Sequence, residues 1–175
     1  MEFEEKTVKE NYIYKGKIIN LKKDEVRLPD GNNSFREIVE HGGGAAVLCV
    51  KDGMVLMVKQ FRYAYKEELW EIPAGKLEPD EPPEKTAVRE LAEETGINAE
   101  TVTLLNVIYP SPGYTNEKIY LYKAEGLNLT KVHLDKDEFL KAVWVKKEEA
   151  LKMASSGEIK DAKTLIALSY IGEMK

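Results

Sequence analysis

The sequence predicts an α+β fold, in which mixed β-strands form a sheet that packs against a few helices. β-type alternation fills residues 11–41, and further strand-like segments follow up to residue 76 and again at "VTLLNVIY" and "KIYLYKAEG". Helical spacing occurs after the two prolines near residue 82 and in two pieces of the C-terminal tail, without regular strand–helix–strand alternation. Hydrophobic residues make up 43% of the chain and charged residues 33%, which is enough apolar material for a core.

The chain divides near residue 42, and the first part predicts an N-terminal antiparallel β-subdomain. Residues 11–41 contain two or three alternating segments, joined in part by the turn sequence "PDGNNS". In such a turn proline presets φ and glycine permits positive φ. We therefore expect residues 1–41 to form the subdomain and residues 42–175 the main domain.

The main domain begins with three expected strands, and a helix follows them. The strands are "GGGAAVLCV", "MVLMVKQF" and "LWEIPAG", separated by "KDG" and "RYAYKEE". Beyond the helix come the two later strands, the loop "PSPGYTNE" between them, the strand "FLKAVWV", and a tail with helical spacing on both sides of "SSGEI". Cys49 lies in an apolar run and is expected to be a buried, inert thiol.

Charge and composition narrow the classes of partner. The net charge is −5 and no long block of Lys and Arg occurs, which disfavours binding to nucleic acid or to an anionic membrane. No apolar run is long enough to cross a bilayer, and the charged N-terminus does not resemble a signal peptide. A single cysteine forms no internal disulfide, which fits a reducing compartment. We expect a cytoplasmic protein.

The helix after Pro82 and Pro83 carries a crowded set of carboxylates. Proline is tolerated in a first helical turn, and Gly96 stands where a left-handed C-terminal stop belongs. Glu90 and Glu94 lie four residues apart, on a flank different from the expected core face. Like charges at this spacing weaken a helix by a few tenths of a kcal/mol. A bound divalent cation reverses the sign of that repulsion, whereas the alternative is a solvated acidic face with Arg89 as partial counterion.

The flanking residues favour the metal site. From Gly75 the chain reads G-x5-E-x7-R-E-U-x-E-E-x-G-U, where U is a bulky aliphatic residue. The filled positions are Gly75, Glu81, Arg89, Glu90, Leu91, Glu93, Glu94, Gly96 and Ile97. This segment resembles the motif of the Nudix hydrolases without a departure. The resemblance implies Mg²⁺-dependent hydrolysis of a nucleoside diphosphate linked to another moiety, and a mixed sheet sandwiched between helices with the motif as loop–helix–loop.

The resemblance also implies roles for the motif residues. Glu90 and Glu94 correspond to the usual metal ligands, and the backbone carbonyl of Ala74 often joins them. Mg²⁺ is the expected ion, with Mn²⁺ as an alternative. Arg89 and Glu81 correspond to structural residues that tie the loop to the helix. Glu93 is a ligand in some members of the family and a base or an Arg89 partner in others.

Segments outside the motif resemble the ADP-ribose pyrophosphatase group of this family. They are "VKQFRYAYKEELWEIPAGKLE", "YPSPGYTNE", in which Pro112 lies 16 residues after Gly96, and the tail "GEIKDAKTLIALSYI". One departure is "HGGG" at 41–44, where a proline often follows the histidine. The resemblance implies the following substrate-binding residues: Arg62 for phosphate or terminal ribose, Glu71 and Glu117 for ribose hydroxyls, Arg36, Phe35 as a candidate adenine stacker, and Ser111.

Three further expectations follow from the same resemblance. The catalytic base is expected in the acidic loop "HLDKDEF", where Glu138 matches better than Asp135 or Asp137, with Glu93 as the second candidate. Residues 1–41 are expected to pack across a twofold axis in a homodimer and to help complete the partner's substrate pocket. The expected activity is cleavage of ADP-ribose to AMP and ribose 5-phosphate. Two alternatives stay open: hydrolysis of another nucleoside diphosphate sugar such as GDP-mannose, and a non-catalytic Nudix domain that senses a nucleotide metabolite.

Overall fold

The computed structural model describes residues 2–134 and 139–173 of the 175-residue chain. The chain forms two compact units, which are described separately. The first consists of Met1–Gly43 and Tyr109–Lys118, and the second of Gly44–Ile108 and Ile119–Lys175. The first unit thus includes a segment from the middle of the chain, which the expected division near residue 42 leaves out.

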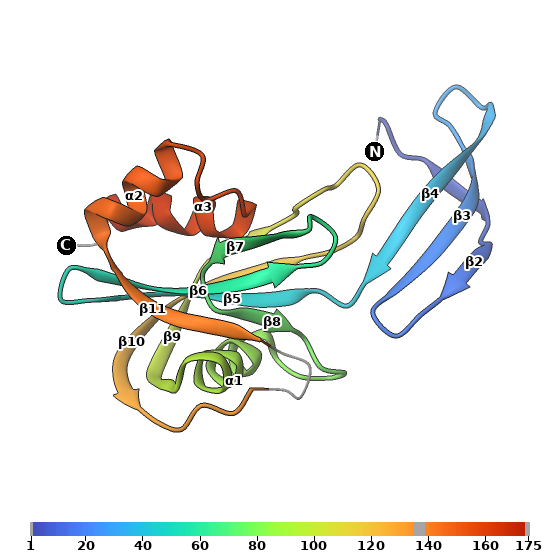
Figure 1. Cartoon of the computed structure of the whole chain (residues 1–175). Coiled ribbons are helices and arrows are strands. Elements are labelled where there is room, and N and C mark those ends of the chain that lie inside the picture. The colour runs from blue at the N-terminus through green and yellow to red at the C-terminus, as the bar shows by residue number, and fades with distance from the viewer. Residues whose placement is uncertain (1, 135–138, 174–175) are drawn as a thin grey trace. The chain divides into compact units, whose positions relative to one another are not determined.

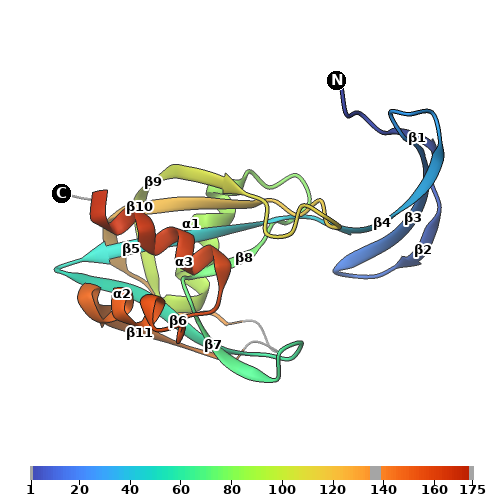
Figure 2. The same ribbon diagram turned by 90° about the horizontal axis from the view of Figure 1, so that it is seen from above.

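The first unit is built on a four-stranded antiparallel sheet (Figures 1 and 2). Its strands are β1 (Lys6–Lys9), β2 (Tyr12–Lys15), β3 (Ile19–Arg27) and β4 (Asn33–His41). β3 pairs with all three other strands, and its register with β4 runs from Ile19 opposite His41 to Arg27 opposite Asn33. The expected turn between β3 and β4 is confirmed, since Gly31 has φ 89° and donates to the carbonyl of Leu28 at 2.9 Å.

The middle segment of the chain is bonded to the end of β4. The amide of Val39 donates to the carbonyl of Tyr114 at 2.8 Å, and the amide of His41 donates to Asn116 Oδ1 at 2.9 Å. One face of the sheet holds a charged cluster, in which the Nζ of buried Lys22 lies 3.0 Å from buried Asp24 and 3.3 Å from Glu40. Buried charges need such partners, because an isolated ion is costly to remove from water.

The second unit has a mixed seven-stranded sheet with helices on both faces. In chain order its elements are β5 (Gly44–Lys51), β6 (Met54–Arg62), β7 (Glu67–Glu71), β8 (Ala74–Lys76), α1 (Pro83–Thr95), β9 (Ile97–Ile108), β10 (Ile119–Leu129), β11 (Leu140–Lys146), α2 (Lys147–Ser155), α3 (Ala162–Ser169) and the 3₁₀ helix η1 (Tyr170–Glu173). The main strand order is β11-β6-β5-β10-β9, with β7 beside β6 and β8 beside β5. Only the β5–β10 pair is parallel among the described strands.

The apolar run in β5 is explained by burial on both faces. Ala46 and Leu48 pack in a cluster with residues of α2, α3 and η1, whereas Ala45, Val47 and Cys49 pack in a second cluster with residues of α1. A strand covered on both sides reads as continuous hydrophobic sequence instead of alternating. Figures 1 and 2 show α1 on the opposite side of the sheet from α2 and α3. The expected α+β fold, a mixed sheet between helices, is therefore confirmed.

Helix α1 begins and ends where the sequence predicts. Pro82 is its N-cap in an extended conformation, and Gly96 closes it with φ 67°. Left-handed φ is readily available to glycine, which explains the stop. Cys49 is fully buried, and burial raises the pKa of its thiol to about 12, as expected of an unreactive cysteine. Among the described residues, no helix has the length and hydropathy that a membrane crossing requires.

Candidate active site

Two carboxylates of α1 converge on the backbone of β8. The amide N–H of Ala74 donates to Glu94 Oε2 at 3.1 Å. Glu94 is only 3% exposed, so it does not belong to a solvated acidic face, which was the alternative to a metal site. Position 94 follows Leu91 by less than one turn, and the helix therefore carries the Glu94 side chain towards β8 together with its apolar face.

Gly75 lacks a side chain where the Glu90 carboxylate lies. A Cβ at this position would stand 1.9 Å from Glu90 Cδ and 2.1 Å from Glu90 Oε1. Any side chain at position 75 would therefore displace the carboxylate. The first residue of the motif is a glycine here because of close approach, and its own φ is not in the left-handed region.

Arg89 ties the acidic residues of the motif together. Its Nη2 lies 2.9 Å from Glu81 Oε2, and its Nη1 donates to Glu90 Oε1 at 2.8 Å and to Glu93 Oε2 at 3.0 Å. Hydrogen bonding from Arg89 holds the pKa of Glu81 down at about 2. Arg89 and Glu81 therefore fasten the loop before α1 to the helix, the structural role implied for them.

The donor set fits a hard divalent cation. Glu90 and Glu94 supply carboxylate oxygens, and the resemblance adds the backbone carbonyl of Ala74, a residue that is bonded to Glu94 through its amide. Mg²⁺ prefers such oxygen ligands and keeps several waters, so it needs few protein side chains. No group of three or more His, Cys, Asp or Glu side chains that could hold a metal occurs in the part of the chain that the structure describes. The fit thus depends on two carboxylates and backbone oxygen.

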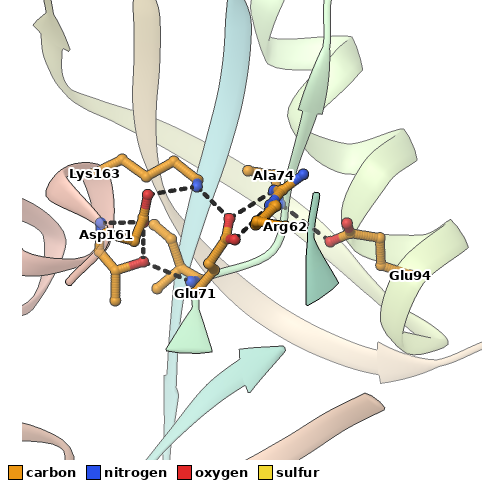
Figure 3. A network of polar contacts seen from close by, with 8 residues as sticks. Arg62, Glu71, Ala74, Glu94, Asp161 and Lys163 are labelled. Carbon is orange, nitrogen blue, oxygen red and sulfur yellow. Dashed lines mark hydrogen bonds and ion pairs between the residues drawn. The ribbon is translucent and has the colours of Figure 1, made fainter. Parts of the chain in front are cut away.

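A second polar network lies beside the first (Figure 3). Arg62, at the end of β6, donates from Nε to Glu71 Oε1 at 2.6 Å and from Nη2 to Glu71 Oε2 at 2.7 Å. Lys163 of α3 donates to Glu71 Oε2 at 2.5 Å. Burial raises the pKa of Glu71, but the Arg62 hydrogen bonds and the Lys163 charge outweigh burial, and the pKa lies below its usual value.

This second network contains residues that sequence reasoning missed. Asp161 is the N-cap of α3 and accepts hydrogen bonds from the Thr164 amide at 3.0 Å and from Thr164 Oγ1 at 2.6 Å. The only local signal was the capping pattern of "DAKT", which marks a helix start and not a partner for Glu71. The structure brings Arg62 and Glu71 together. Both Glu71 oxygens accept from protein cations, and the expected binding of ribose by Glu71 stays a prediction.

The other expected substrate-binding residues belong to the first unit. Arg36 pairs with Glu5 and donates to the carbonyl of Phe35 at 2.9 Å. The Phe35 ring is 60% exposed, and Lys23 Nζ lies 5.4 Å from its centroid. The remaining two lie in the 109–118 segment, where Glu117 Oε1 is 3.4 Å from His41 Nδ1 and the Ser111 carbonyl accepts from the Tyr114 amide at 3.3 Å. Their substrate roles stay predictions.

The structure describes only one of the two candidates for the catalytic base. Glu93 lies on α1 with its side chain 40% exposed and bonded to Arg89. Glu138, together with Asp135 and Asp137, lies outside the described residues. The choice between Glu93 and Glu138 as the base therefore stays a prediction.

Comparison with known proteins gives the class. Residues 40–167 match the NUDIX domain family model, and residues 5–39 match the nucleoside diphosphate sugar hydrolase N-terminal domain. The chain therefore belongs to the NUDIX family of hydrolases. A solved structure of an ADP compounds hydrolase has the same fold with a TM-score of 0.85, covering 97% of this chain and 93% of that one at 17% identity.

Curated relatives match most of the chain. An ADP-ribose pyrophosphatase of Bacillus subtilis (strain 168) is 47% identical over 96% of this chain and 92% of its own. A methanol dehydrogenase activator of Bacillus methanolicus is 42% identical over 97% of this chain and 93% of its own. A GDP-mannose pyrophosphatase of Yersinia enterocolitica is 36% identical over 78% of this chain and 76% of its own.

Replacing Gly75 by alanine is expected to lower turnover by about 10–100-fold without unfolding the protein. The new methyl group would meet the end of a flexible side chain, Glu90, so the carboxylate moves while the backbone stays. Steady-state hydrolysis and the circular dichroism spectrum would check both parts. Gly172→Ala is the matched control, since nothing lies within 4 Å of its added Cβ. Unchanged turnover in Gly75→Ala would mean that the position of Glu90 does not matter.

Proposed function

We propose that this protein is a Mg²⁺-dependent ADP-ribose pyrophosphatase that cleaves ADP-ribose to AMP and ribose 5-phosphate. The observation that carries the proposal is the convergence of Glu90 and Glu94 on the backbone of Ala74 and Gly75, with the glycine left bare for the carboxylate. The resemblance to the Bacillus subtilis ADP-ribose pyrophosphatase and the match to the sugar hydrolase N-terminal domain support the choice of substrate.

The motif residues divide the work in this proposal. Glu90, Glu94 and the Ala74 carbonyl would hold Mg²⁺, or Mn²⁺ as the alternative ion, which would supply neutralisation of diphosphate charge and activation of water. Arg89 fixes Glu90 and keeps it over Gly75. Arg62, whose side chain is 41% exposed, binds a phosphate oxygen of the substrate. A carboxylate of Glu138 or Glu93 accepts the proton of the attacking water.

Two other functions are favoured by particular observations. The similarity to a GDP-mannose pyrophosphatase favours a different base or sugar. The similarity to a protein named as a methanol dehydrogenase activator favours a regulatory role. The motif keeps Arg89, Glu90, Glu93 and Glu94, however, and a domain that only sensed a metabolite would not need the complete set. Hydrolysis of ADP-ribose therefore stays the proposed activity.

The deciding experiment is a panel of nucleoside diphosphate compounds assayed with Mg²⁺, with Mn²⁺ and with a chelator. ADP-ribose, other ADP-sugars and GDP-mannose should be included, and the products identified by chromatography. We expect ADP-ribose to have the highest kcat/KM, to give AMP and ribose 5-phosphate, and to be untouched in the chelator. A preference for GDP-mannose would move the assignment to the first alternative, and absence of hydrolysis would move it to the second.

We also propose that the enzyme is a cytoplasmic homodimer in which the first unit packs against its copy. Tyr14, Ile19 and Phe35 lie on one face of its sheet by register, and all three are exposed. A small sheet that exposes apolar side chains gains stability from a partner surface. Light scattering at micromolar concentration should give the mass of two chains, and cell fractionation should find the protein with cytoplasmic markers. A fully active monomer would contradict the dimer.

A further inference from the structure

The buried Glu71 carboxylate is shared by two cations that come from distant parts of the chain. Arg62 holds it through Nε and Nη2, at 2.6 and 2.7 Å, and Lys163 holds it through Nζ at 2.5 Å (Figure 3). Glu71 is 2% exposed, and the Lys163 side chain is 10% exposed. The Arg62 side chain, in contrast, is 41% exposed. Lys163 is thus the inner cation and Arg62 the outer one.

The start of α3 fixes the position of the inner cation. Lys163 Nζ also lies 3.0 Å from Oδ1 of Asp161, whose other carboxylate oxygen caps the helix. Thr164 Oγ1 accepts a hydrogen bond from the Ile72 amide at 2.8 Å. The first turn of α3 is therefore bonded to both residue 71 and residue 72, and these bonds fix the position of Glu71.

This connection continues to the motif. Ala74 follows Ile72 by two residues, and its amide donates to Glu94 at 3.1 Å. In the view of Figure 3, the Arg62 side chain is drawn between the carboxylates of Glu71 and Glu94. Within the described residues, Arg62 Nη1 donates no hydrogen bond, while Nε and Nη2 are held by Glu71. One nitrogen of the guanidinium is therefore left for a ligand.

The charges in the cluster indicate that Lys163 affects Arg62 through its charge as well as through packing. The cluster contains two cations, Arg62 and Lys163, and two anions, Glu71 and Asp161. Because Lys163 neutralises part of the Glu71 charge, Arg62 keeps attraction for a further anion. Without the ammonium, Arg62 would be the only cation on a buried carboxylate and would be drawn more strongly towards it.

We propose that Lys163 is a positioning residue for substrate binding: by sharing the Glu71 carboxylate, it holds Arg62 where Nη1 can bind the diphosphate of a nucleoside diphosphate sugar. The step at the phosphate rests on the proposed function. The control of Arg62 by Lys163 rests on the geometry of the cluster alone.

The test uses Lys163→Gln in the full chain. Loss of the ammonium should raise KM for ADP-ribose by about 5–10-fold and leave kcat within about twofold, because ground-state binding of phosphate is what weakens. A second variant, Lys163→Gln with Asp161→Asn, removes one charge of each sign and keeps the cluster neutral. It should show the same rise in KM if the single variant fails to fold. Lys160→Gln is the matched control, since Lys160 pairs with Glu67 at 2.7 Å on the surface of the same segment.

A spectroscopic measurement separates positioning from stability. The chain has four arginines, so the Nε–H signal of Arg62 can be assigned in a ¹⁵N–¹H spectrum by its loss in Arg62→Lys. We expect this signal to shift and to exchange faster with water in both Lys163 variants, and to stay unchanged in Lys160→Gln. A lower melting temperature with unchanged KM and unchanged Arg62 signal would overturn the proposal, as would an equal rise in KM in the control.

Failure of the proposed function would give a different result from failure of the positioning role of Lys163. If the wild-type protein hydrolysed none of the nucleoside diphosphate compounds, the assigned activity would be wrong, and the KM comparison would be replaced by the Arg62 signal during titration with inorganic pyrophosphate. A pyrophosphate-induced shift in the wild type that is weakened in Lys163→Gln supports the positioning role. Equal shifts in the two proteins overturn it.

Discussion

Glu94→Gln is expected to lose about 10³-fold of the Mg²⁺-dependent turnover while the protein keeps its fold. Glutamine has the size of glutamate, and its amide oxygen can still accept the hydrogen bond from the Ala74 amide. What disappears is the negative charge that would hold the cation, and bound cations supply several kcal/mol of transition-state stabilisation. At about 1.4 kcal/mol for each tenfold change in rate, a loss of this size is expected.

The measurement compares kcat/KM across Mg²⁺ concentrations with Mg²⁺ affinity from calorimetry. Glu84→Gln is the matched control, because Glu84 lies in the first turn of the same helix with an exposed side chain and is outside the assigned ligand set. Helix α1 loses one acidic side chain in either variant, so their melting temperatures should lie close together. Full Mg²⁺-dependent activity in Glu94→Gln would show that the ligand assignment is wrong.

Local signals in the sequence were sufficient to predict helix α1 and the sheet beside it. The helix is bounded by Pro82 and Gly96, whose conformational preferences act within a few residues. The unbroken apolar run of β5 identifies a strand, and burial on both of its faces accounts for the absence of polar alternation. Glu90 and Gly75 were identified as positions of the motif that resembles the Nudix hydrolases, but the close approach between them is visible only in three dimensions.

The contacts that sequence could not predict join residues far apart along the chain. Lys163 and Glu71 are separated by 92 positions, and their meeting depends on how α3 packs against the sheet. The same is true of the hydrogen bond between Val39 and Tyr114, which connects a loop from the middle of the chain to the N-terminal strands. No periodicity or cap records such pairings, because they are consequences of topology and not of local preference.

The second large effect is expected at the catalytic base. Glu138→Gln should lower kcat by about 10²–10³-fold with little change in KM. Glu90 and Glu94 are assigned to the metal, and a carboxylate that shares its lone pairs with a cation is a poor proton acceptor. Glu93 is engaged by Arg89 at 3.0 Å, and Arg89 also holds Glu81 and Glu90. A carboxylate from outside the motif is therefore needed.

The comparison that decides the base uses Glu138→Gln and Glu93→Gln at saturating Mg²⁺ with ADP-ribose. Asp135→Asn and Asp137→Asn are matched controls from the same acidic stretch of sequence, and both should retain most of the wild-type kcat. A transition-state interaction lowers kcat and kcat/KM together, whereas a lost ligand contact would raise KM. Mg²⁺ affinity should stay unchanged in Glu138→Gln, because this residue is outside the ligand set. If Glu138→Gln stays near wild type while Glu93→Gln collapses with Mg²⁺ binding intact, the base lies on α1 and the loop assignment fails.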